Sequence, residues 1–458
     1  MMMALLLANM SCSPKTGKTE TQDTSCEVKL ITLDPGHFHA ALVQKTSYPQ
    51  VCKDVYVYAP EGEDLKEHLK RIEGYNTRTE SPTGWSEITY TGADFLEKML
   101  QEKKGNVMVT AGNNGKKTDY LKAALSAGLH VLADKPMAIN VADFEALKEC
   151  FEIARQKGVL LFDIMTERFE ITSILQKEFS LIPGVYGEQQ KGTPDDPGIV
   201  IESVHHFLKT VSGSPLIRPA WFFDVEQQGD GIVDVTTHLV DLIQWACFPS
   251  QTIDYTKDVE IIDANRWDTP LTLAEFQKVT GTNAYPEYLK KDVREDILHV
   301  YSNGDITYRI KGVTAKVSVI WNYTFPEGGG DTHYSIMKGS KSHLMIEQGK
   351  EQGYQPVLTI KTLKGIEQAS FEKELTGALK TITAKYPDVA LTKQAEGVWK
   401  VEIPEKYYNG HEAHFGQVTE HFLHYVAAGT LPEWEVPNMI AKYYVTTAAL
   451  EMAKNKQK

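Results

Sequence analysis

Short apolar segments alternate with amphipathic segments along the first third of the chain, and this alternation restricts the fold more than any other feature. A strand followed by a helix carries the chain back over one face of a sheet, so the next strand lies parallel to the first. We therefore expect a doubly wound α/β domain, with a Rossmann sheet, at residues 27–165. Its strands are expected at 28–33, 54–58, 107–110, 130–133 and 159–164, and its helices at 40–45, 64–72, 91–104, 118–127 and 141–157.

Beyond residue 296 the pattern becomes strand-rich. The segment ILHVYSNGDITYRIKG predicts a hairpin that turns at Asn303-Gly304, a dipeptide typical of two-residue turns. This part of the chain predicts an α+β domain at residues 166–458, in which helices accompany an open, mainly antiparallel β-sheet. Residues 366–410 fit neither pattern and are interpreted as an insertion. Further strands are expected at 315–323, 334–337, 343–347 and 357–362, and closing helices at 415–428 and 438–452.

The net charge of −13 argues against a nucleic-acid ligand, because such proteins need a basic face to displace counterions from phosphates. A small neutral or polar substrate agrees better with this charge. No cysteine or histidine spacing suits zinc, and we expect no metal. Cys26 and Cys52 precede the first two expected strands, whose beginnings are neighbours in a parallel sheet, so they are the pair considered for a disulfide. Two buried free cysteines are the alternative.

The first residues, MMMALLLANMSC, form a short apolar run before a polar segment. This order is similar to a bacterial lipoprotein signal, which implies a leader and linker at residues 1–26, lipidation of Cys12 and a place on the periplasmic side of a membrane. The run lacks a preceding lysine or arginine, and Asn9 stands where an aliphatic residue is usual. A cytoplasmic protein with an apolar N-terminus is the alternative. No later segment reaches the length of a spanning helix, so membrane contact is expected only through the lipid anchor.

The turn after the first expected strand is the phosphate site of a Rossmann domain, because helix N-terminal amides meet the pyrophosphate there. Here it reads LDPGHFHAAL. Gly36 matches the middle glycine of the GxGxxG fingerprint, while Asp34 and His39 replace the first and third. An ordinary Pro-Gly turn explains the same letters. The candidate cofactor ligands in this turn are Gly36, His37, Phe38 and His39.

Glu61 follows the second expected strand, where an acid accepts hydrogen bonds from the adenosine ribose. No arginine follows it directly to bind a 2′-phosphate, which favours NAD over NADP. A solvated carboxylate in a loop rich in glutamate and glycine is the alternative.

Residues 107–136, VMVTAGNNGKKTDYLKAALSAGLHVLADKP, carry the most specific pattern. They resemble the segment between the fourth strand and the Glu-Lys-Pro signature of the Gfo/Idh/MocA family, named after glucose-fructose oxidoreductase and inositol dehydrogenase. Asn114 matches the asparagine of that family's Thr-Pro-Asn-like turn, and Lys117 occupies its usual histidine position. Asp134-Lys135-Pro136 replaces Glu-Lys-Pro. The resemblance implies that the nicotinamide side of the cofactor is lined by Asn113, Asn114, Asp134 and Lys135.

Lys135 precedes a proline, which disfavours the α region and predicts an extended corner. The family's Lys-Pro peptide is often cis, so the resemblance implies a cis bond at Lys135-Pro136. Farther along, Thr166-Glu167-Arg168-Phe169 matches the Arg-Phe start of the family's second domain, and Arg168 is taken as another cofactor ligand.

The segment GDGIVDVTTHLVDLIQW predicts a helix that carries Asp234 and His238 on one face. Four residues apart, they can hydrogen-bond each other or converge on one substrate hydroxyl. One alternative is that the two residues form an ion pair on the helix surface. Another is that they are two ligands of a metal ion, although the sequence offers no clear third ligand. The pair matches the family's Asp-xxx-His. In the strand-like segment GIVIESVHHFLK, His205 and His206 are substrate candidates, of which at most one points into the site because strand neighbours face opposite ways.

The resemblance implies hydride transfer between a sugar-like hydroxyl and NAD. His238 accepts the hydroxyl proton, Asp234 orients the histidine or binds a neighbouring hydroxyl, and Lys135 holds the reacting oxygen and the nicotinamide ribose. The implied reaction oxidises a sugar or glycoside at C3 to a 3-keto-glycoside with tightly bound NAD, in a homo-oligomer. The alternatives are an NAD-dependent glycosidase that eliminates after transient oxidation, and a non-catalytic sugar-binding lipoprotein.

Overall fold

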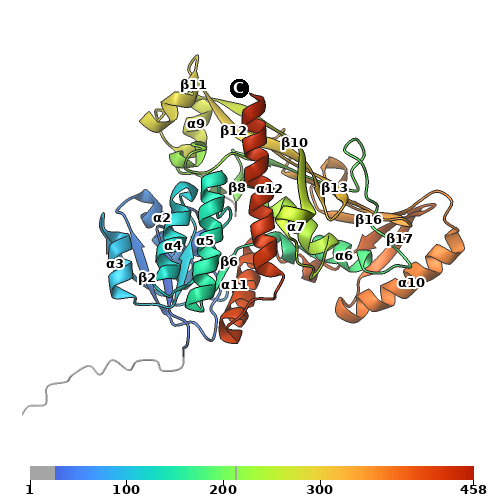
Figure 1. Cartoon of the computed structure of the whole chain (residues 1–458), viewed down its shortest axis with the longest axis horizontal. Coiled ribbons are helices and arrows are strands. Elements are labelled where there is room, and N and C mark those ends of the chain that lie inside the picture. The colour runs from blue at the N-terminus through green and yellow to red at the C-terminus, as the bar shows by residue number, and fades with distance from the viewer. Residues whose placement is uncertain (1–25, 212–213, 458) are drawn as a thin grey trace, which may run out of the picture.

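The computed structural model describes residues 26–211 and 214–457, and Cys12 with most of the expected leader lies outside them. Two large sheets organise the chain (Figure 1): a six-stranded sheet flanked by helices in the N-terminal part, and a ten-stranded sheet in the C-terminal part. The predicted fold class, a Rossmann domain followed by an α+β domain with an open sheet, is confirmed. No described helix is long and apolar enough to cross a bilayer.

The first sheet has the strand order β3-β2-β1-β4-β5-β6, and all neighbouring pairs are parallel. This is the order of a doubly wound dinucleotide-binding sheet, whose switch point lies between β1 and β4. Its elements are β1 Leu30–Leu33, α1 His39–Leu42, β2 Asp54–Ala59, α2 Glu63–Thr77, β3 Ser86–Thr91, α3 Phe95–Glu102, β4 Val107–Thr110, the 3-10 turn η1 Asn114–Lys116, α4 Lys117–Ser126, β5 His130–Ala133, α5 Val141–Lys157 and β6 Leu161–Asp163.

The helix expected at 91–104 is wrong at its start, because the edge strand β3 ends at Thr91 and α3 begins only at Phe95. Residues Ser86–Thr91 include Ile88, Thr89, Tyr90 and Thr91, which are residue types common in strands, and the segment is largely exposed, as is usual for an edge strand. The bounds expected for α5 are confirmed. The Asn140 side chain caps its first turn by accepting a hydrogen bond from the Asp143 amide at 2.9 Å.

The second sheet has the order β10-β12-β13-β7-β14-β15-β16-β18-β17, with β11 on β12. Its pairs are antiparallel except β7 with β13. The segment interpreted as an insertion forms a helix and the two strands that extend one edge of this sheet. The elements are η2 Thr166–Phe169, α6 Ile171–Ser180, β7 Ile199–His206, β8 Thr210–Val211, β9 Ser214–Pro215, η3 Ala220–Phe223, α7 Thr236–Cys247, α8 Tyr255–Asp258, β10 Val259–Thr272, α9 Leu273–Thr280, η4 Glu287–Asp292, β11 Val293–Arg294, β12 Ile297–Ile310, β13 Val313–Asn322, β14 Thr332–Lys338, β15 Ser342–Gln348, η5 Lys350–Gln352, β16 Val357–Thr362, α10 Gln368–Lys385, β17 Ala390–Ala395, β18 Val398–Glu402, η6 Glu405–Tyr407, α11 His411–Ala428 and α12 Glu435–Lys456.

The hairpin predicted at Asn303-Gly304 is wrong, because both residues lie inside the continuous strand β12. The Asn303 side chain accepts a hydrogen bond from the Trp321 amide at 2.6 Å and so binds the neighbouring strand. Gly304 permits a close approach, since a Cβ there would lie 2.7 Å from the Cβ of Ile232. The chain turns instead at Lys311-Gly312, where the φ angles are 48° and 80°.

The last two helices return to the first sheet. In Figure 1, α12 runs between the two sheets, and it packs on α5 on one side and on α7 and β10 on the other. Phe415, Phe422, Met439 and Tyr443 from α11 and α12 are buried in the same core as β1, β4 and β5. The core of the Rossmann domain therefore includes side chains from beyond residues 27–165, and these helices fix the two sheets relative to each other.

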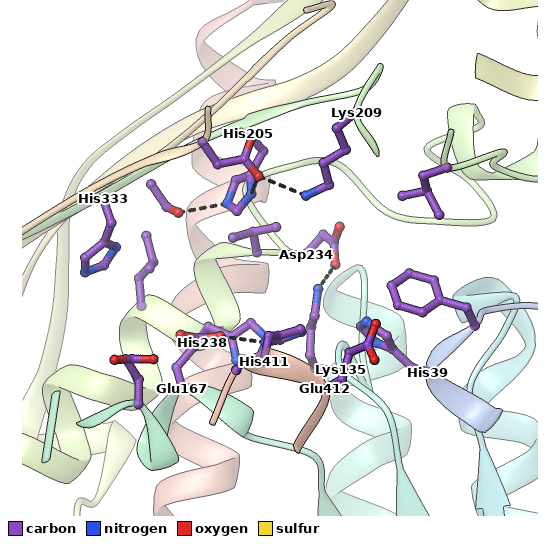
Figure 2. Close-up of a pocket in the computed structure, with 18 of the residues that line it drawn as sticks. His39, Lys135, Glu167, His205, Lys209, Asp234, His238, His333, His411 and Glu412 are labelled. Carbon is purple, nitrogen blue, oxygen red and sulfur yellow. Dashed lines mark hydrogen bonds and ion pairs between the residues drawn. The ribbon is translucent and has the colours of Figure 1, made fainter. Parts of the chain in front are cut away.

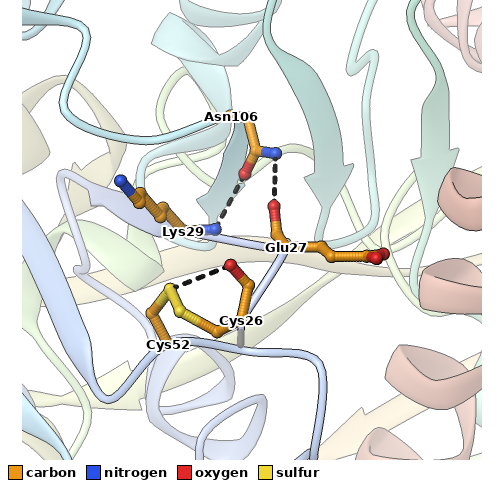
Figure 3. Close-up of a disulfide and its surroundings, with 5 residues drawn as sticks. All are labelled: Cys26, Glu27, Lys29, Cys52 and Asn106. Carbon is orange, nitrogen blue, oxygen red and sulfur yellow. Dashed lines mark hydrogen bonds between the residues drawn. A yellow bond between two sulfur atoms is a disulfide. The ribbon is translucent and has the colours of Figure 1, made fainter. Parts of the chain in front are cut away.

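Cys26 and Cys52 form a disulfide directly before β1 and β2, with Cα atoms 5.1 Å apart (Figure 3). The pair considered from the sequence is therefore bonded. Beside it, the Asn106 side chain accepts a hydrogen bond from the Lys29 amide at 2.8 Å and donates one to the Glu27 carbonyl at 3.0 Å. These contacts fix the path of the chain as it enters β1.

Candidate active site

A cavity of about 760 Å³ lies at the carboxyl ends of β1, β4 and β5, and side chains of the second domain close it (Figure 2). This edge, at the switch point of the sheet, is where doubly wound proteins bind ligands. The sequence candidates that line the cavity are His37, Phe38, His39, Asn114, Asp134, Lys135, His205, Asp234 and His238. Those that do not line it are Gly36, Glu61, Asn113, Arg168 and His206.

A buried lysine shapes the corner that presents Lys135. Lys117 Nζ donates hydrogen bonds to the carbonyl oxygens of Asp134 at 2.7 Å and Pro136 at 2.9 Å, and to Asn114 Oδ1 at 2.5 Å. Burial lowers the pKa of Lys117 to about 8. The Lys135-Pro136 peptide is cis, as predicted. Lys117 therefore binds the backbone on both sides of Lys135.

Lys135 is paired with Asp234 across the boundary between the two domains (Figure 2). Lys135 Nζ lies 2.5 Å from Asp234 Oδ1, and the two side chains are only 10% and 7% exposed. Gln228 Nε2 donates to the other carboxylate oxygen at 3.1 Å. Burial alone would raise the pKa of Asp234, but attraction to Lys135 outweighs it and holds that pKa below its ordinary value. Each carboxylate oxygen thus accepts one hydrogen bond, and Lys135 and Asp234 form a buried salt bridge.

His238 lies in the first turn of α7 and lines the cavity near this pair. Asp234 is not on the helix as predicted, because α7 begins at Thr236 and the carboxylate belongs to the turn before it. The Asp234 carboxylate binds Lys135, and His238 Nδ1 is buried without a hydrogen-bond partner among the described residues. Burial, and then the charge of Lys135, lower the pKa of His238 to about 4. The imidazole is therefore neutral at physiological pH and can accept a proton.

The first turn keeps a glycine-like backbone although two fingerprint glycines are replaced. Asp34 has a φ of 46°, the left-handed conformation that glycine adopts most readily. Tyr120 Oη donates to Asp34 Oδ2 at 2.7 Å. The amides of Gly36 and His37 donate to the Ala111 carbonyl at 3.1 and 3.0 Å. In this conformation, neither of these two amides is free for a phosphate.

His39, at the third fingerprint position, is buried against Asp134 and Phe415. Its Nδ1 lies 3.0 Å from Asp134 Oδ2, and His37 Nδ1 lies 3.8 Å from the same oxygen. One atom of each of these three polar side chains lies within 4.8 Å of the others, a spacing that could hold a metal ion. Burial lowers the pKa of both histidines well below the ordinary value, and the nearby Lys135 lowers it further. Because that positive charge disfavours another cation, we interpret the cluster as a hydrogen-bonded wall of the cavity.

Trp221 of the second domain covers the first turn. Its Nε1 donates to Asp64 Oδ2 at 2.9 Å and so joins η3 to α2. A Cβ at Gly36 would lie 3.0 Å from Trp221 Cζ2 and 3.2 Å from Asp64 Oδ2. The surviving glycine of the fingerprint is therefore required by a close approach between the domains.

The two asparagines after β4 bind the second domain. Asn113 Nδ2 donates to Gln227 Oε1, and Asn114 Nδ2 donates to the Gln228 carbonyl, both at 2.8 Å. Asn114 lines the cavity, but the protein already uses both polar atoms of its side chain. Glu61 is exposed in the loop after β2, where it stays a candidate for the ribose.

Arg168 belongs to a buried salt-bridge network outside the cavity. Its Nε and Nη2 each lie 2.7 Å from an Asp241 oxygen, and its Nη1 lies 2.8 Å from Glu435. Burial alone would lower the pKa of Arg168, but the two acids outweigh it and raise that pKa well above its ordinary value. The guanidinium holds α7 to α12, so the cofactor contact expected from the sequence is not available to it.

Of the two adjacent histidines, only His205 lines the cavity, in agreement with the strand geometry. Its ring stacks on Trp321 with centroids 4.9 Å apart. His206 is buried, with Nδ1 2.9 Å from Asp331 Oδ1. Asp331 also accepts a hydrogen bond from Lys209 Nζ at 2.8 Å. This ion pair on the cavity wall was not anticipated from the sequence.

A second pair of titratable side chains faces the cavity. Glu167 Oε1 lies 3.4 Å from His411 Nδ1, and Figure 2 places both near His238. Burial raises the pKa of Glu167, but the contact with His411 outweighs this and holds the pKa below its ordinary value. The acid directly before Arg168 in a matched motif was the only sequence signal. Nothing local pointed to His411, which reaches the site because α11 folds back onto the first sheet.

Two family models match the chain. Residues 57–163 match the model described as "Oxidoreductase family, NAD-binding Rossmann fold". Residues 175–454, more than half of the chain, match the model described as "Putative oxidoreductase C terminal domain". The two matches correspond to the two sheets.

Solved structures share the fold over nearly the whole chain. A "putative oxidoreductase" from Parabacteroides merdae is 68% identical, with a TM-score of 0.93 over 94% of this chain and 98% of its own. GenD2 from gentamicin A biosynthesis, in complex with NAD, is 13% identical, with a TM-score of 0.56 over 97% and 98%. KijD10, a 3-ketoreductase from Actinomadura kijaniata in complex with NADP, is 15% identical, with a TM-score of 0.54 over 91% and 95%. The last two likenesses show the fold alone.

Among curated proteins, biliverdin reductase A from Mus musculus is 34% identical over 79 residues, which is 16% of this chain. The match spans 26% of that reductase. The human enzyme is 31% identical over 87 residues, again 26% of its length. The chain therefore matches only about a quarter of the length of these relatives.

Proposed function

The chain belongs to the Gfo/Idh/MocA oxidoreductase family, whose N-terminal domain is an NAD-binding Rossmann fold, and on that basis we propose that it is an NAD-dependent oxidoreductase of carbohydrates. One observation carries the proposal. The cavity at the switch point brings the Lys135–Asp234 ion pair together with the neutral imidazole of His238. We propose that the substrate is a sugar or glycoside whose ring hydroxyl at C3 becomes a ketone.

The residues at the ends of β4 and β5 fit the nicotinamide half of the cofactor. Gly112, Asn114 and Lys135 line the cavity there. A Cβ at Gly112 would lie 2.5 Å from the Asp34 carbonyl oxygen, so this wall of the cavity carries no side chain at that point. When bound, the nicotinamide supplies the hydride chemistry, while the protein positions the reactants. Trp221, which covers Gly36, supports a cofactor that stays bound through the catalytic cycle.

Each of the three candidate catalytic residues has a separate role in the reaction of the substrate hydroxyl. His238 accepts the hydroxyl proton, because its depressed pKa keeps the imidazole neutral. Lys135 stabilises the substrate oxygen as it gains negative charge. Asp234 positions Lys135 through the 2.5 Å contact and does not bind the histidine. The hydroxyl proton passes to His238, the hydride leaves the ring carbon for the oxidised nicotinamide that the site would hold, and a ketone remains.

Preference for ring position C3 rests on the family resemblance and has one further support. KijD10, which shares the fold, is a 3-ketoreductase. A C3 ketone also acidifies the proton on C2, so a separate lyase could act on the product. The second candidate function, an NAD-dependent glycosidase, performs that elimination in the same site.

The Glu167–His411 pair is the observation that favours this second candidate. It offers a proton-transfer group in the same cavity as His238 but distinct from it. An enzyme that both oxidises C3 and eliminates the C1 substituent needs more than one such group. Glu167→Gln is then expected to stop aglycone release while oxidation at C3 continues.

Purified protein tests the proposal directly. Absorbance and mass spectrometry detect bound NAD, and nuclear magnetic resonance of glycoside incubations identifies the product. An accumulating 3-keto-glycoside supports the oxidoreductase, whereas free aglycone without net redox change supports the glycosidase. Protein that holds no NAD, and whose melting temperature does not change on adding NAD, would reject both.

We also propose export to the periplasmic side of a bacterial membrane, with Cys12 lipidated. The Cys26–Cys52 disulfide supports this location, because disulfides persist in oxidising compartments. Labelling with a radioactive fatty acid tests it: label is expected on the wild-type chain and not on Cys12→Ser. A homo-oligomer formed through the open sheet is a further proposal, which light scattering after size exclusion tests.

A further inference from the structure

Among the described residues, Arg218 is the cation in the cavity wall that forms no ion pair with a carboxylate. The lysine and arginine side chains that line the cavity in the described chain are Lys45, Lys135, Lys209 and Arg218. The three lysines form ion pairs with Glu412, Asp234 and Asp331, respectively. Arg218 makes one side-chain hydrogen bond, from Nε to the Phe207 carbonyl at 3.4 Å, and no ion pair with any described residue.

Arg218 is only 5% exposed, so its charge is withdrawn from water. Its guanidinium carbon lies 4.7 Å from the ring centroid of Phe222 and 5.1 Å from that of Trp321. The Arg218 amide donates to the Val279 carbonyl at 2.8 Å, which fixes the backbone. Stacking on aromatic faces holds the plane of a guanidinium but leaves its edge N–H groups unbonded.

A buried cation without an anionic partner costs free energy that a folded protein normally avoids. Burial lowers the pKa of Arg218 to about 10, which still leaves it charged at neutral pH. The neighbouring residues 210–215, TVSGSP, carry no acidic side chain. Asp331 and Asp234 raise the pKa of Arg218 through their charges, but neither forms an ion pair with it in the described chain, so a ligand remains as the source of a directly bound anion.

The surroundings place Arg218 on the substrate side of the cavity. Arg218 stacks on Trp321, and His205, which also lines the cavity, stacks on the same ring, so Arg218 lies on the wall that the second domain contributes. A phosphate of the cofactor is therefore not the anion that this geometry favours.

We propose that Arg218 binds a singly charged anionic substituent of the substrate, a carboxylate or a sulfate, so that the preferred substrate is an acidic glycoside rather than a neutral one. This proposal rests on the proposed function and names the substrate class of the same site. The planar guanidinium donates two parallel N–H bonds to a carboxylate, as in a hexuronic acid, or to two sulfate oxygens. The sugar ring then lies between Arg218 and His238, which both line the cavity.

Calorimetric titration of the NAD-loaded protein tests this with three probes: methyl β-D-glucoside, methyl β-D-glucuronide and methyl β-D-glucoside 6-sulfate. At least one anionic probe is expected to bind about tenfold or more tightly than the neutral glucoside, as a charge-assisted bidentate contact predicts. Whichever anionic probe binds tighter identifies the substituent. Equal binding of all three probes would overturn the proposal.

Two variants locate the effect. Arg218→Gln is expected to abolish the preference for the anionic probe while NAD content stays unchanged. Arg218→Lys keeps the charge but not the fork, so an intermediate preference is expected. If Arg218→Gln does not fold, the ratio of anionic to neutral probe affinity in the wild-type protein and in Arg218→Lys tests the proposal. A variant that loses NAD but keeps the preference would overturn the proposal, since Arg218 would then serve the cofactor.

The binding assay does not require hydride transfer, which separates this proposal from the proposed function. Anionic probes that bind in an Arg218-dependent manner but are never oxidised leave the anion site standing and reject the oxidoreductase. Oxidation of neutral glycosides as fast as acidic ones, with no Arg218 dependence, leaves the oxidoreductase standing and rejects the anion site.

Discussion

Lys135 Nζ lies 2.5 Å from Asp234 Oδ1, so a lysine of the Rossmann domain and an acid of the second domain form one buried ion pair. The pair determines what each partner can do. The Asp234 oxygens accept hydrogen bonds from Lys135 and Gln228, and no hydrogen bond joins Asp234 to His238 among the described residues. Lys135 is held over the cavity, and its own charge helps to keep the nearby imidazole neutral.

Lys135→Ala and Asp234→Ala are each expected to lower kcat about 100-fold, the typical loss when one stabilising donor at a developing oxyanion is removed. The double variant is expected to lose no more than either single variant, because the two side chains act as a unit. Steady-state kinetics of all four proteins form the cycle. Losses that multiply would show that the two residues act independently.

The pH dependence of kcat/KM is expected to have an unusually low acidic limb. His238 must be neutral to accept a proton, and its pKa is lowered to about 4 by burial and then by Lys135. Activity should therefore persist well below the ordinary histidine pKa of about 6.5 and fall only near pH 4. Glu167 acts in the opposite direction, since its negative charge raises the pKa of His238.

Glu167→Gln supplies the control for this profile. Removal of the carboxylate charge is expected to move the acidic limb to still lower pH. An acidic limb near pH 6.5 in the wild-type enzyme, unchanged in Glu167→Gln, would show that a different group accepts the proton.

The Cys26–Cys52 disulfide closes a loop with a sequence separation of 26 residues, and we expect it to stabilise the fold by about 3 kcal/mol. Urea unfolding of wild type and of the double variant Cys26→Ser, Cys52→Ser measures the difference. The paired substitution avoids a single free thiol. Equal midpoints for oxidised wild type and double variant would mean that the bond adds nothing.

Local patterns predicted β1, β2, β4, β5 and β6 of the first sheet, because each strand–helix unit carries its own periodicity. They missed the edge strand β3, whose residues are largely exposed and carry no continuous apolar run. The segment that ends at Pro136 placed Lys135 at the carboxyl end of β5, where the structure has it. The hairpin prediction failed because the dipeptide Asn303-Gly304 is typical of turns. In the structure, Gly304 instead allows the close approach of Ile232 to the strand.

The rest of the candidate site depends on contacts between distant parts of the chain. Arg168 was predicted to be a cofactor ligand because it is part of a matched motif, but it forms ion pairs with Asp241 and Glu435 outside the cavity. His411 enters the site through the return of α11, which no local pattern encodes. Arg218 was not predicted as a site residue, because its proposed role depends on the lack of an ion pair with any described carboxylate. No local sequence pattern indicates that an ion pair is missing.

Trp221→Ala is expected to speed the release of bound NAD about tenfold, which corresponds to the loss of one hydrogen bond with its contact. The indole lies over Gly36 and is tied to Asp64 by the 2.9 Å hydrogen bond, so it closes the first turn from the other domain. Exchange of bound cofactor for isotopically labelled NAD, followed by mass spectrometry, measures the rate. Trp221→Phe keeps an aromatic cover but loses the hydrogen bond, so an intermediate rate is expected. Wild-type exchange rates in both variants would mean that the indole joins the domains without retaining the cofactor.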